Sequence, residues 1–206
     1  IHAAGTTKTG AGSVNLPVVC AGVEVRPGDV VLLPPSALSS TSAFMSAREP
    51  TVAPPRTRWR RRMPTALDVA AYIVEKVGPV SSFKLQKLLY YCQAWSLVWE
   101  EKPLFRAEIQ AWANGPVVPE LYRLHRGKFE VGSWPRGDAD KLAEADRAVV
   151  DAVLDFYGDK TSQWLSDLTH RERPWRDARG SLAAGERGTQ PISLASMHEY
   201  YSGLGE

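Results

Sequence analysis

Few residues of this chain have the types and spacing that chemistry requires, and the clearest pair is His170 and Glu172. An imidazole and a carboxylate two positions apart could serve as acid and base toward a substrate. No third group that would orient the imidazole accompanies them in the sequence. The alternative, which we favour, is that His170 ends a helix, where its cationic form suits the helix dipole, and that Glu172 is a loop charge.

No other motif supports catalysis. The histidines show no H-E-x-x-H spacing and the cysteines no C-x-x-C spacing, so the sequence predicts no metal site. Gly5–Gly10 (GTTKTG) resembles a phosphate-binding loop in part, but the required Gly-Lys-Ser/Thr ending is missing. We therefore expect a protein that is not an enzyme and has no cofactor.

Charge is distributed unevenly along the chain. Residues 1–62 hold eight Lys/Arg and three Asp/Glu, a net charge of +5, whereas residues 63–206 hold seventeen and twenty, a net charge of −3. Because nucleic acid requires a basic face, we do not expect residues 63–206 to bind it. The basic cluster Arg56–Arg62 leaves an alternative open, a nucleic-acid-binding regulator, although a solvated tail is the simpler interpretation.

The cysteines and the hydropathy pattern indicate a compartment. Cys20 and Cys92 are far apart in the sequence, and we interpret both as reduced thiols in a cytoplasmic protein. Cys92 falls in an apolar helical pattern, where a buried small side chain is expected. No apolar run reaches 18 residues, so no membrane span is predicted.

The sequence divides into three parts. Residues 1–33 contain two β-branched runs joined by a turn at Pro27–Asp29, and the sequence PVVCAGVEVRPGDVV resembles a C-terminal fragment of the HMG/oxaloacetate aldolase family. The site motif of such aldolases is absent, so no aldolase function is expected of this fragment. Residues 34–62 are rich in Pro, Ser and Arg and predict a disordered linker. Because the chain begins with Ile1, we expect a truncated or fused reading frame, with Met63 as the natural start of the second protein.

Helical periodicity begins at Met63 and predicts a compact, mainly α-helical domain over 63–206. Thr65–Asp68 has the form of a capping box, and a helix apolar nearly all round is predicted at 83–99 and should be buried at the centre. Short β elements are expected at Glu108–Trp112 and Phe129–Val131, and a turn at Asn114–Pro116. Further helices are expected at 119–126, 138–157, 161–169 and 192–201, with a loop at 171–191.

Four separated blocks of this domain resemble the antitoxin SocA-like (Panacea domain) family, also described as phage-associated GepA-like. The blocks are Phe83–Trp95 (FKLQKLLYYCQAW), Pro103–Phe105, Ala111–Pro119 with Leu121-Tyr122 behind it, and Leu168–Trp175 (LTHRERPW). Their order and spacing make the resemblance specific over about 66–201. Two departures are Ser96, where many relatives have His, and Glu100-Glu101, where a turn often carries Gly.

The resemblance implies an antitoxin of a type II toxin–antitoxin system that neutralises a cognate protein toxin by direct binding. It also implies a ClpXP-type protease as a further partner, to which an adaptor hands the toxin. The segment Leu85–Tyr91 has two interpretations: a partner-binding surface with Gln86 and Lys87 as the exposed pair, or core. The apolar residues there are expected to be core, and for Gln86 and Lys87 both interpretations stay open. The family motif positions taken as partner-binding candidates are Lys84, Gln86, Lys87, Tyr91, Trp95, Trp112, Gly115, Pro116, Tyr122, His170 and Trp175.

Overall fold

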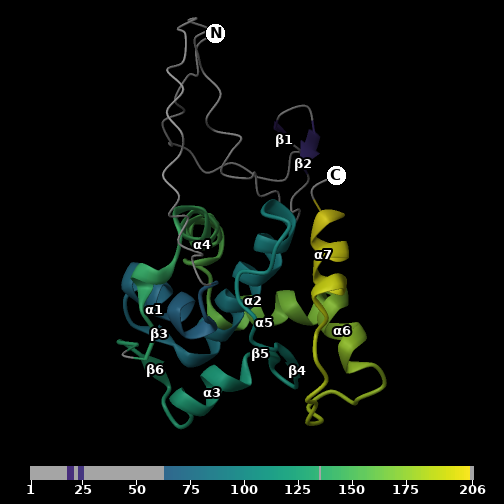
Figure 1. Cartoon of the computed structure of the whole chain (residues 1–206). Helices are drawn as coiled ribbons and strands as arrows, with labels where there is room; N and C mark the ends of the chain where they lie inside the picture. The colour runs from purple at the N-terminus through teal and green to yellow at the C-terminus, as the bar shows by residue number, and fades with distance from the viewer. Residues whose placement is uncertain (1–17, 21–22, 26–62, 135, 205–206) are drawn as a thin grey trace, which may run out of the picture. The chain divides into compact units, whose positions relative to one another are not determined.

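A computed structural model of the chain describes residues 18–20, 23–25, 63–134 and 136–204 (Figure 1). Within the first unit, residues 1–31, strand β1 (Val18–Cys20) pairs antiparallel with β2 (Val23–Val25). Both strands fall inside the first of the two predicted β-branched runs, which is therefore a hairpin and not a single strand. The predicted turn at 27–29, the linker 34–62 and the basic cluster 56–62 lie outside the described residues.

The helical unit opens with α1 (Ala66–Val77), and its start confirms the predicted capping box. The Thr65 hydroxyl accepts a hydrogen bond from Asp68 N (3.2 Å), and the Asp68 carboxylate accepts one from Thr65 N (2.9 Å). The helix ends at Gly78, whose φ of +73° is a conformation that glycine adopts without strain.

Helix α2 (Ser82–Trp99) is the centre of the domain, as predicted. Ser81 caps it by accepting a hydrogen bond from Lys84 N (3.2 Å). Helices α1, α4, α5 and α7 all pack on α2, and Figure 1 shows it running between α4 and α7. Its burial is so complete that the expectation of an exposed pair is wrong: Gln86 is only 3% exposed and Lys87 only 1%.

Helix α4 (Glu144–Tyr157) is shorter than the predicted 138–157 helix. Asp138 caps a single 3-10 turn, η2 (Ala139–Lys141), and Leu142 after it has extended backbone (ψ 129°), which interrupts the helical hydrogen bonds. Helix α5 (Ser162–Arg171) follows, with Thr161 as its cap.

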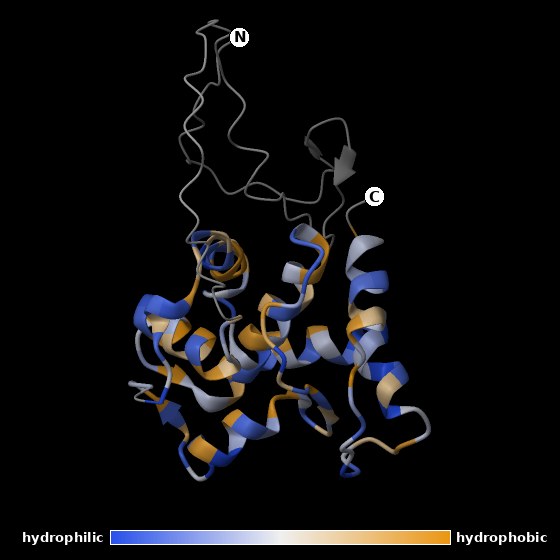
Figure 2. Ribbon diagram, in the orientation of Figure 1, coloured by the Kyte–Doolittle hydropathy of each residue, from blue (hydrophilic) through white to orange (hydrophobic). Residues whose placement is uncertain are grey.

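The segment predicted as a loop, 171–191, contains helix α6 (Arg173–Arg179). Pro174 lies in the first turn, where its missing N–H costs nothing, so the proline that suggested a loop is compatible with a helix start. Helix α7 (Leu194–Ser202) closes the domain, and Ser193 caps it by accepting from Ser196 N. Figure 2 shows α6 as predominantly hydrophilic, which explains why hydrophobic periodicity did not reveal it.

Two short antiparallel pairs complete the fold. Strand β3 (Val80–Ser81) pairs with β6 (Glu130–Val131), and β4 (Gln110–Trp112) pairs with β5 (Gly115–Val117). The hairpin turn therefore lies at 113–114, and Gly115-Pro116 belong to a strand, contrary to the predicted turn. Helix α3 (Pro119–His125) follows, with Pro119 in its first turn as predicted.

Hydrophobic stretches of α1, α2 and α4 meet in the interior (Figure 2). Cys92 of α2 is fully buried, which confirms its expected role as a small core side chain, and its thiol is free. None of the helices described in the structure is long and apolar enough to cross a membrane.

Candidate functional site

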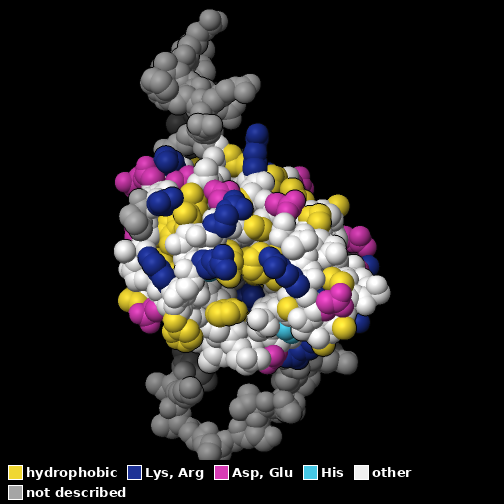
Figure 3. Space-filling model, turned by 90° about the horizontal axis from the view of Figure 1, so that it is seen from below, with side chains coloured by type: hydrophobic (Ala, Val, Ile, Leu, Met, Phe, Trp, Pro, Cys, Tyr) yellow, Lys and Arg dark blue, Asp and Glu magenta, His cyan; other side chains and the backbone are white. Residues whose placement is uncertain are grey.

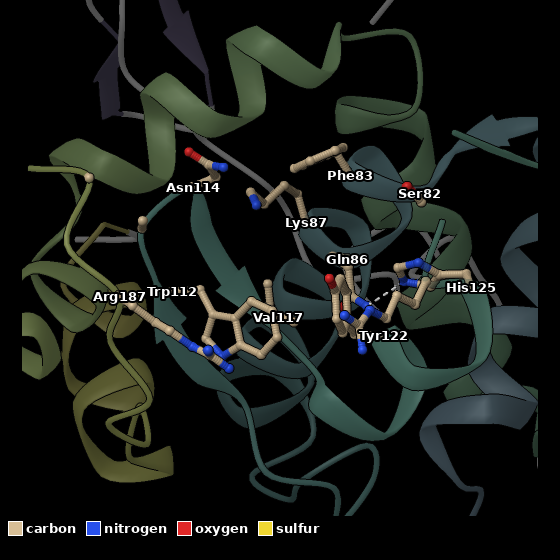
Figure 4. Close-up of a pocket in the computed structure, with 13 residues that line it drawn as sticks. Ser82, Phe83, Gln86, Lys87, Trp112, Asn114, Val117, Tyr122, His125 and Arg187 are labelled. Carbon is tan, nitrogen blue, oxygen red and sulfur yellow. Dashed lines mark hydrogen bonds between the residues drawn. The ribbon is translucent and has the colours of Figure 1, made fainter. Parts of the chain in front are cut away.

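A pocket of about 430 Å³ opens beside the first half of α2. Its walls come from α2, the β4–β5 hairpin, the end of α3 and the loop after α6 (Figure 4). The lining residues are Ser82, Phe83, Gln86, Lys87, Trp112, Ala113, Asn114, Val117, Tyr122, His125, Arg126, Gly185 and Arg187.

Lys87 is the most unusual member of this lining. Its side chain is 1% exposed, yet within the described residues its ammonium forms no hydrogen bond or ion pair, and Figure 4 shows it directed toward the Asn114 side of the pocket. Burial disfavours the charged form and lowers the pKa of Lys87 from 10.5 to about 7. A buried ammonium without a partner is costly, and it is a group that an anion would stabilise.

Gly115 makes room for this lysine. A Cβ atom at residue 115 would lie 2.6 Å from Lys87 Cε and 2.8 Å from Lys87 Nζ, and the φ of Gly115 is +104°. Only glycine satisfies both the space and the backbone conformation. Gly115, a family motif position, therefore contributes to the site by leaving space for the Lys87 side chain.

Gln86 fixes the state of His125 on the opposite wall. Gln86 Oε1 accepts a hydrogen bond from Val118 N (2.7 Å), which orients the amide and turns Nε2 toward His125 Nε2 at 2.8 Å (dashed in Figure 4). Since the amide nitrogen can only donate, His125 Nε2 is an acceptor and the ring is neutral. Burial also favours the neutral ring, because it lowers the pKa of His125.

The pocket is basic although the domain as a whole is acidic. Arg126 and Arg187 are exposed members of the lining, and the lining contains no Asp or Glu. Figure 3 shows Lys and Arg side chains gathered around hydrophobic side chains and a hollow on this face of the molecule. Local charge therefore favours an anionic partner.

Aromatic side chains form the rest of the opening. Phe83 is 52% exposed, and the rings of Trp112 and Tyr122 meet edge to face with centroids 4.7 Å apart. Exposed aromatic and arginine side chains together are the residue types that anchor protein interfaces.

A layer behind the hairpin holds Trp112 in place. Trp175 Nε1 donates to the carbonyl oxygen of Trp112 (3.0 Å), and the Trp175 ring stacks on His170 with centroids 4.3 Å apart. The Arg179 guanidinium lies over Trp175 and donates to the carbonyls of Ala111, Ala183 and Glu186. These bonds tie the loop that carries Arg187 to the hairpin.

Glu172 is not the loop charge that the sequence suggested. It is 3% exposed, and its carboxylate accepts hydrogen bonds from the hydroxyls of Tyr201 (2.8 Å) and Tyr91 (3.3 Å). Burial raises the pKa of Glu172 to about 7. No hydrogen bond joins it to His170, whose ring nitrogen Nε2 is buried without a partner in the described part of the chain, so the two residues do not form an acid–base pair.

The structure divides the predicted site residues into three groups. Gln86, Lys87, Trp112 and Tyr122 line the pocket, and Gly115, His170 and Trp175 support it. Lys84, Tyr91, Trp95 and the buried Pro116 do not line it: Lys84 donates to the carbonyl of Gly158, and Tyr91 and Trp95 belong to the aromatic core.

Nine members of the lining were not among the predicted site residues, and four of these nine carry the aromatic, imidazole and cationic groups of the site: Phe83, His125, Arg126 and Arg187. The signal that could have revealed Phe83 is its place as an aromatic residue in the first turn of an otherwise buried helix. The signal that could have revealed His125 and Arg126 is the basic end of the predicted 119–126 helix. Nothing local indicated Arg187, because the loop that carries it reaches the pocket only through tertiary contacts.

The two departures from the family pattern have structural roles. Ser96 is fully buried, and its hydroxyl donates to the carbonyl of Lys102 (2.9 Å), closing the chain segment that follows α2. Glu101 has a φ of +52°, a left-handed conformation that favours glycine, at the place where the resemblance expects Gly.

Within the described residues, no group of three or more His, Cys, Asp or Glu side chains is arranged to hold a metal ion. The site is a pocket with one buried lysine, a neutral imidazole, basic side chains at the opening and aromatic walls. Such a lining can bind an anionic, partly apolar group.

Comparison with known proteins finds a family match within the helical unit. Residues 85–176 match the family model described as "Antitoxin SocA-like, Panacea domain". The protein Antitoxin SocA of Caulobacter vibrioides (strain NA1000 / CB15N) is 44% identical over 59 residues, which are 27% of this chain and 31% of that relative's length. No solved structure matches the chain. Residues 85–176 therefore belong to the antitoxin SocA-like, Panacea domain family.

Proposed function

We propose that this chain is an antitoxin of a type II system, which neutralises a cognate protein toxin by direct contact. The observation that carries the proposal is the family match over 85–176, together with the relative named Antitoxin SocA. The pocket lies largely within the matched segment, which provides most of its lining.

We assign the toxin contact to the face around the pocket opening. Phe83, Trp112 and Tyr122 offer apolar anchors there, and Arg126 and Arg187 offer charge. Tyr91 and Trp95 are 0% and 2% exposed, so a folded domain cannot present them to a partner, and in this proposal they serve the core.

Co-expression with the product of the neighbouring gene tests the proposal. We expect the chain to restore growth to cells that express the toxin and to co-purify with it. Phe83→Ala and Arg187→Glu should weaken both effects, because both side chains are at the pocket opening. Phe129→Ala is the matched control, since Phe129 is 80% exposed but does not line the pocket.

The resemblance also predicts that a ClpXP-type protease takes part. The toxin's lifetime in cells with and without the protease measures this step separately. If the chain protects cells equally well with and without the protease, direct binding alone accounts for the neutralisation.

A further inference from the structure

We propose that the pocket at Lys87 is a binding site for a carboxylate carried on an apolar group. The inference goes beyond the antitoxin proposal, because it concerns the chemistry of the pocket itself. It holds whether a partner protein or a small molecule supplies the carboxylate.

The buried ammonium of Lys87 has no counter-charge among the residues that line the pocket. Lys87 is buried and directed into the pocket, and within the described residues no carboxylate or carbonyl oxygen accepts a hydrogen bond from its ammonium. Lys84, a partly buried lysine of the same helix, differs because it donates to the carbonyl of Gly158 at 2.6 Å. An anion from outside the domain is therefore the missing partner of Lys87.

The charged side chains that line the pocket are all positive. Arg126 and Arg187 line the pocket with Lys87, and His125 beside them is neutral. Because no acidic side chain lines the pocket, nothing there repels an incoming anion, and a cationic ligand would have no counter-charge.

The composition of the lining favours a carboxylate over a phosphate. Of the three cationic side chains in the lining only Lys87 is buried, so the interior offers one ammonium to one negative charge, whereas Arg126 and Arg187 lie exposed at the opening. Phosphate sites generally supply several converging backbone N–H groups or arginine forks, because a dianion has more oxygens to satisfy. Here the walls are the rings of Trp112 and Tyr122 and the side chain of Val117, which require an apolar body beside the charge.

The size of the site fits one residue-sized group. A pocket of about 430 Å³ lies at the lower end of the range typical of ligand sites. Partial exposure of Phe83 extends the apolar wall to the surface, so the body of the ligand can continue outward.

Titration calorimetry on the full chain tests this inference with three probes: N-acetyl-L-phenylalanine, its amide N-acetyl-L-phenylalaninamide, and inorganic phosphate. We expect the carboxylate to bind at least about tenfold more tightly than the amide, because a charge-assisted hydrogen bond to Lys87 is lost in the amide. Binding at pH 7 should take up protons, since an anion beside Lys87 raises its pKa from about 7.

Two variants make the test specific. Lys87→Met keeps the length of the stem and removes the ammonium, and it should abolish the preference for the carboxylate and the proton uptake. Arg187→Gln changes an exposed side chain, so it tests the site without disturbing the core, and it should weaken carboxylate binding several-fold. Lys128→Met, an exposed lysine that does not line the pocket, is the control and should bind as the parent does.

Peptide arms separate the sources of the carboxylate. If a peptide of six residues ending in a free C-terminal phenylalanine binds much more tightly than the single residue, the ligand comes from a protein. Equal affinities assign the site to a small molecule. Equal binding of acid and amide, tighter binding of phosphate, or no binding of any probe would overturn the inference, and none of these outcomes bears on growth rescue by the antitoxin.

Discussion

Lys87 and Gly115 are so close that a Cβ atom on residue 115 would lie 2.6 Å from Lys87 Cε. One residue comes from the central helix α2 and the other from strand β5, so the contact joins the core to the hairpin. The buried ammonium, and with it the pocket, depends on the missing side chain of Gly115.

Gly115→Ala should therefore destabilise the domain by roughly 2–4 kcal/mol, because it combines a steric clash with a strained φ of +104°. Urea unfolding followed by circular dichroism measures the loss. Gly127→Ala is the matched control: φ is +82° and a Cβ meets nothing within 4 Å, so only the backbone strain of about 1–2 kcal/mol applies. Equal losses in the two variants would contradict the role of Lys87 in the clash.

Lys87→Met should change how stability depends on pH. The folded pKa of about 7 lies below the ordinary 10.5, so between these values the unfolded chain binds more protons and the parent becomes more stable as pH rises. The variant should lose this rise and gain roughly 2–4 kcal/mol relative to the parent near pH 7. Denaturant melts at pH 7 and pH 9.5 measure both effects, and Lys128→Met should keep the parental slope.

Glu172→Gln should remove a decrease in stability that the parent shows as pH rises from 4.5 to about 7. The folded pKa of about 7 lies above the ordinary 4.5, so the stabilisation is fully present below pH 4.5 and is lost as pH rises through 7. The effect is of the order of 3 kcal/mol. Melts between pH 4.5 and pH 8 should flatten in this variant but not in Glu130→Gln, which changes an exposed carboxylate on β6. A parental profile in Glu172→Gln would exclude Glu172 as the source.

Arg179→Met should loosen the wall of the pocket that carries Arg187. Arg179 donates to the carbonyls of Ala183 and Glu186 at 2.8 and 2.9 Å, and these bonds hold the loop. We expect faster amide exchange over residues 183–189 and a loss of roughly 2 kcal/mol in stability. Arg176→Met, an exposed arginine on the same helix, should leave the exchange unchanged.

The sequence predicted the parts of the fold that depend on local patterns. The Thr65–Asp68 capping box and the buried helix at 83–99 are confirmed, because capping residues and apolar periodicity act over a few positions. Helix α6 was missed because it has no such local pattern: it is short and hydrophilic. Contacts between residues distant in the sequence, such as Trp175 to Trp112, hold it in place.

The site was predicted only in part, for a related reason. The resemblance selected Lys87, Gly115 and Trp112, but Lys87 was expected on the surface in one interpretation of the helix and in the core in the other, and a lysine usually lies on the surface. Its burial depends on the close approach of a glycine from another element, which spacing alone does not reveal. Arg187 joins the site through a tertiary connection made by Arg179.

The most direct test of the antitoxin account is growth rescue by co-expression with the neighbouring gene product, combined with co-purification. We predict that the parent and Phe129→Ala rescue growth and bind the toxin, whereas Phe83→Ala and Arg187→Glu do so at least about tenfold less well. Absence of both rescue and complex with the folded parent would contradict the account. Full rescue by both pocket variants would contradict the assignment of the toxin contact to this face.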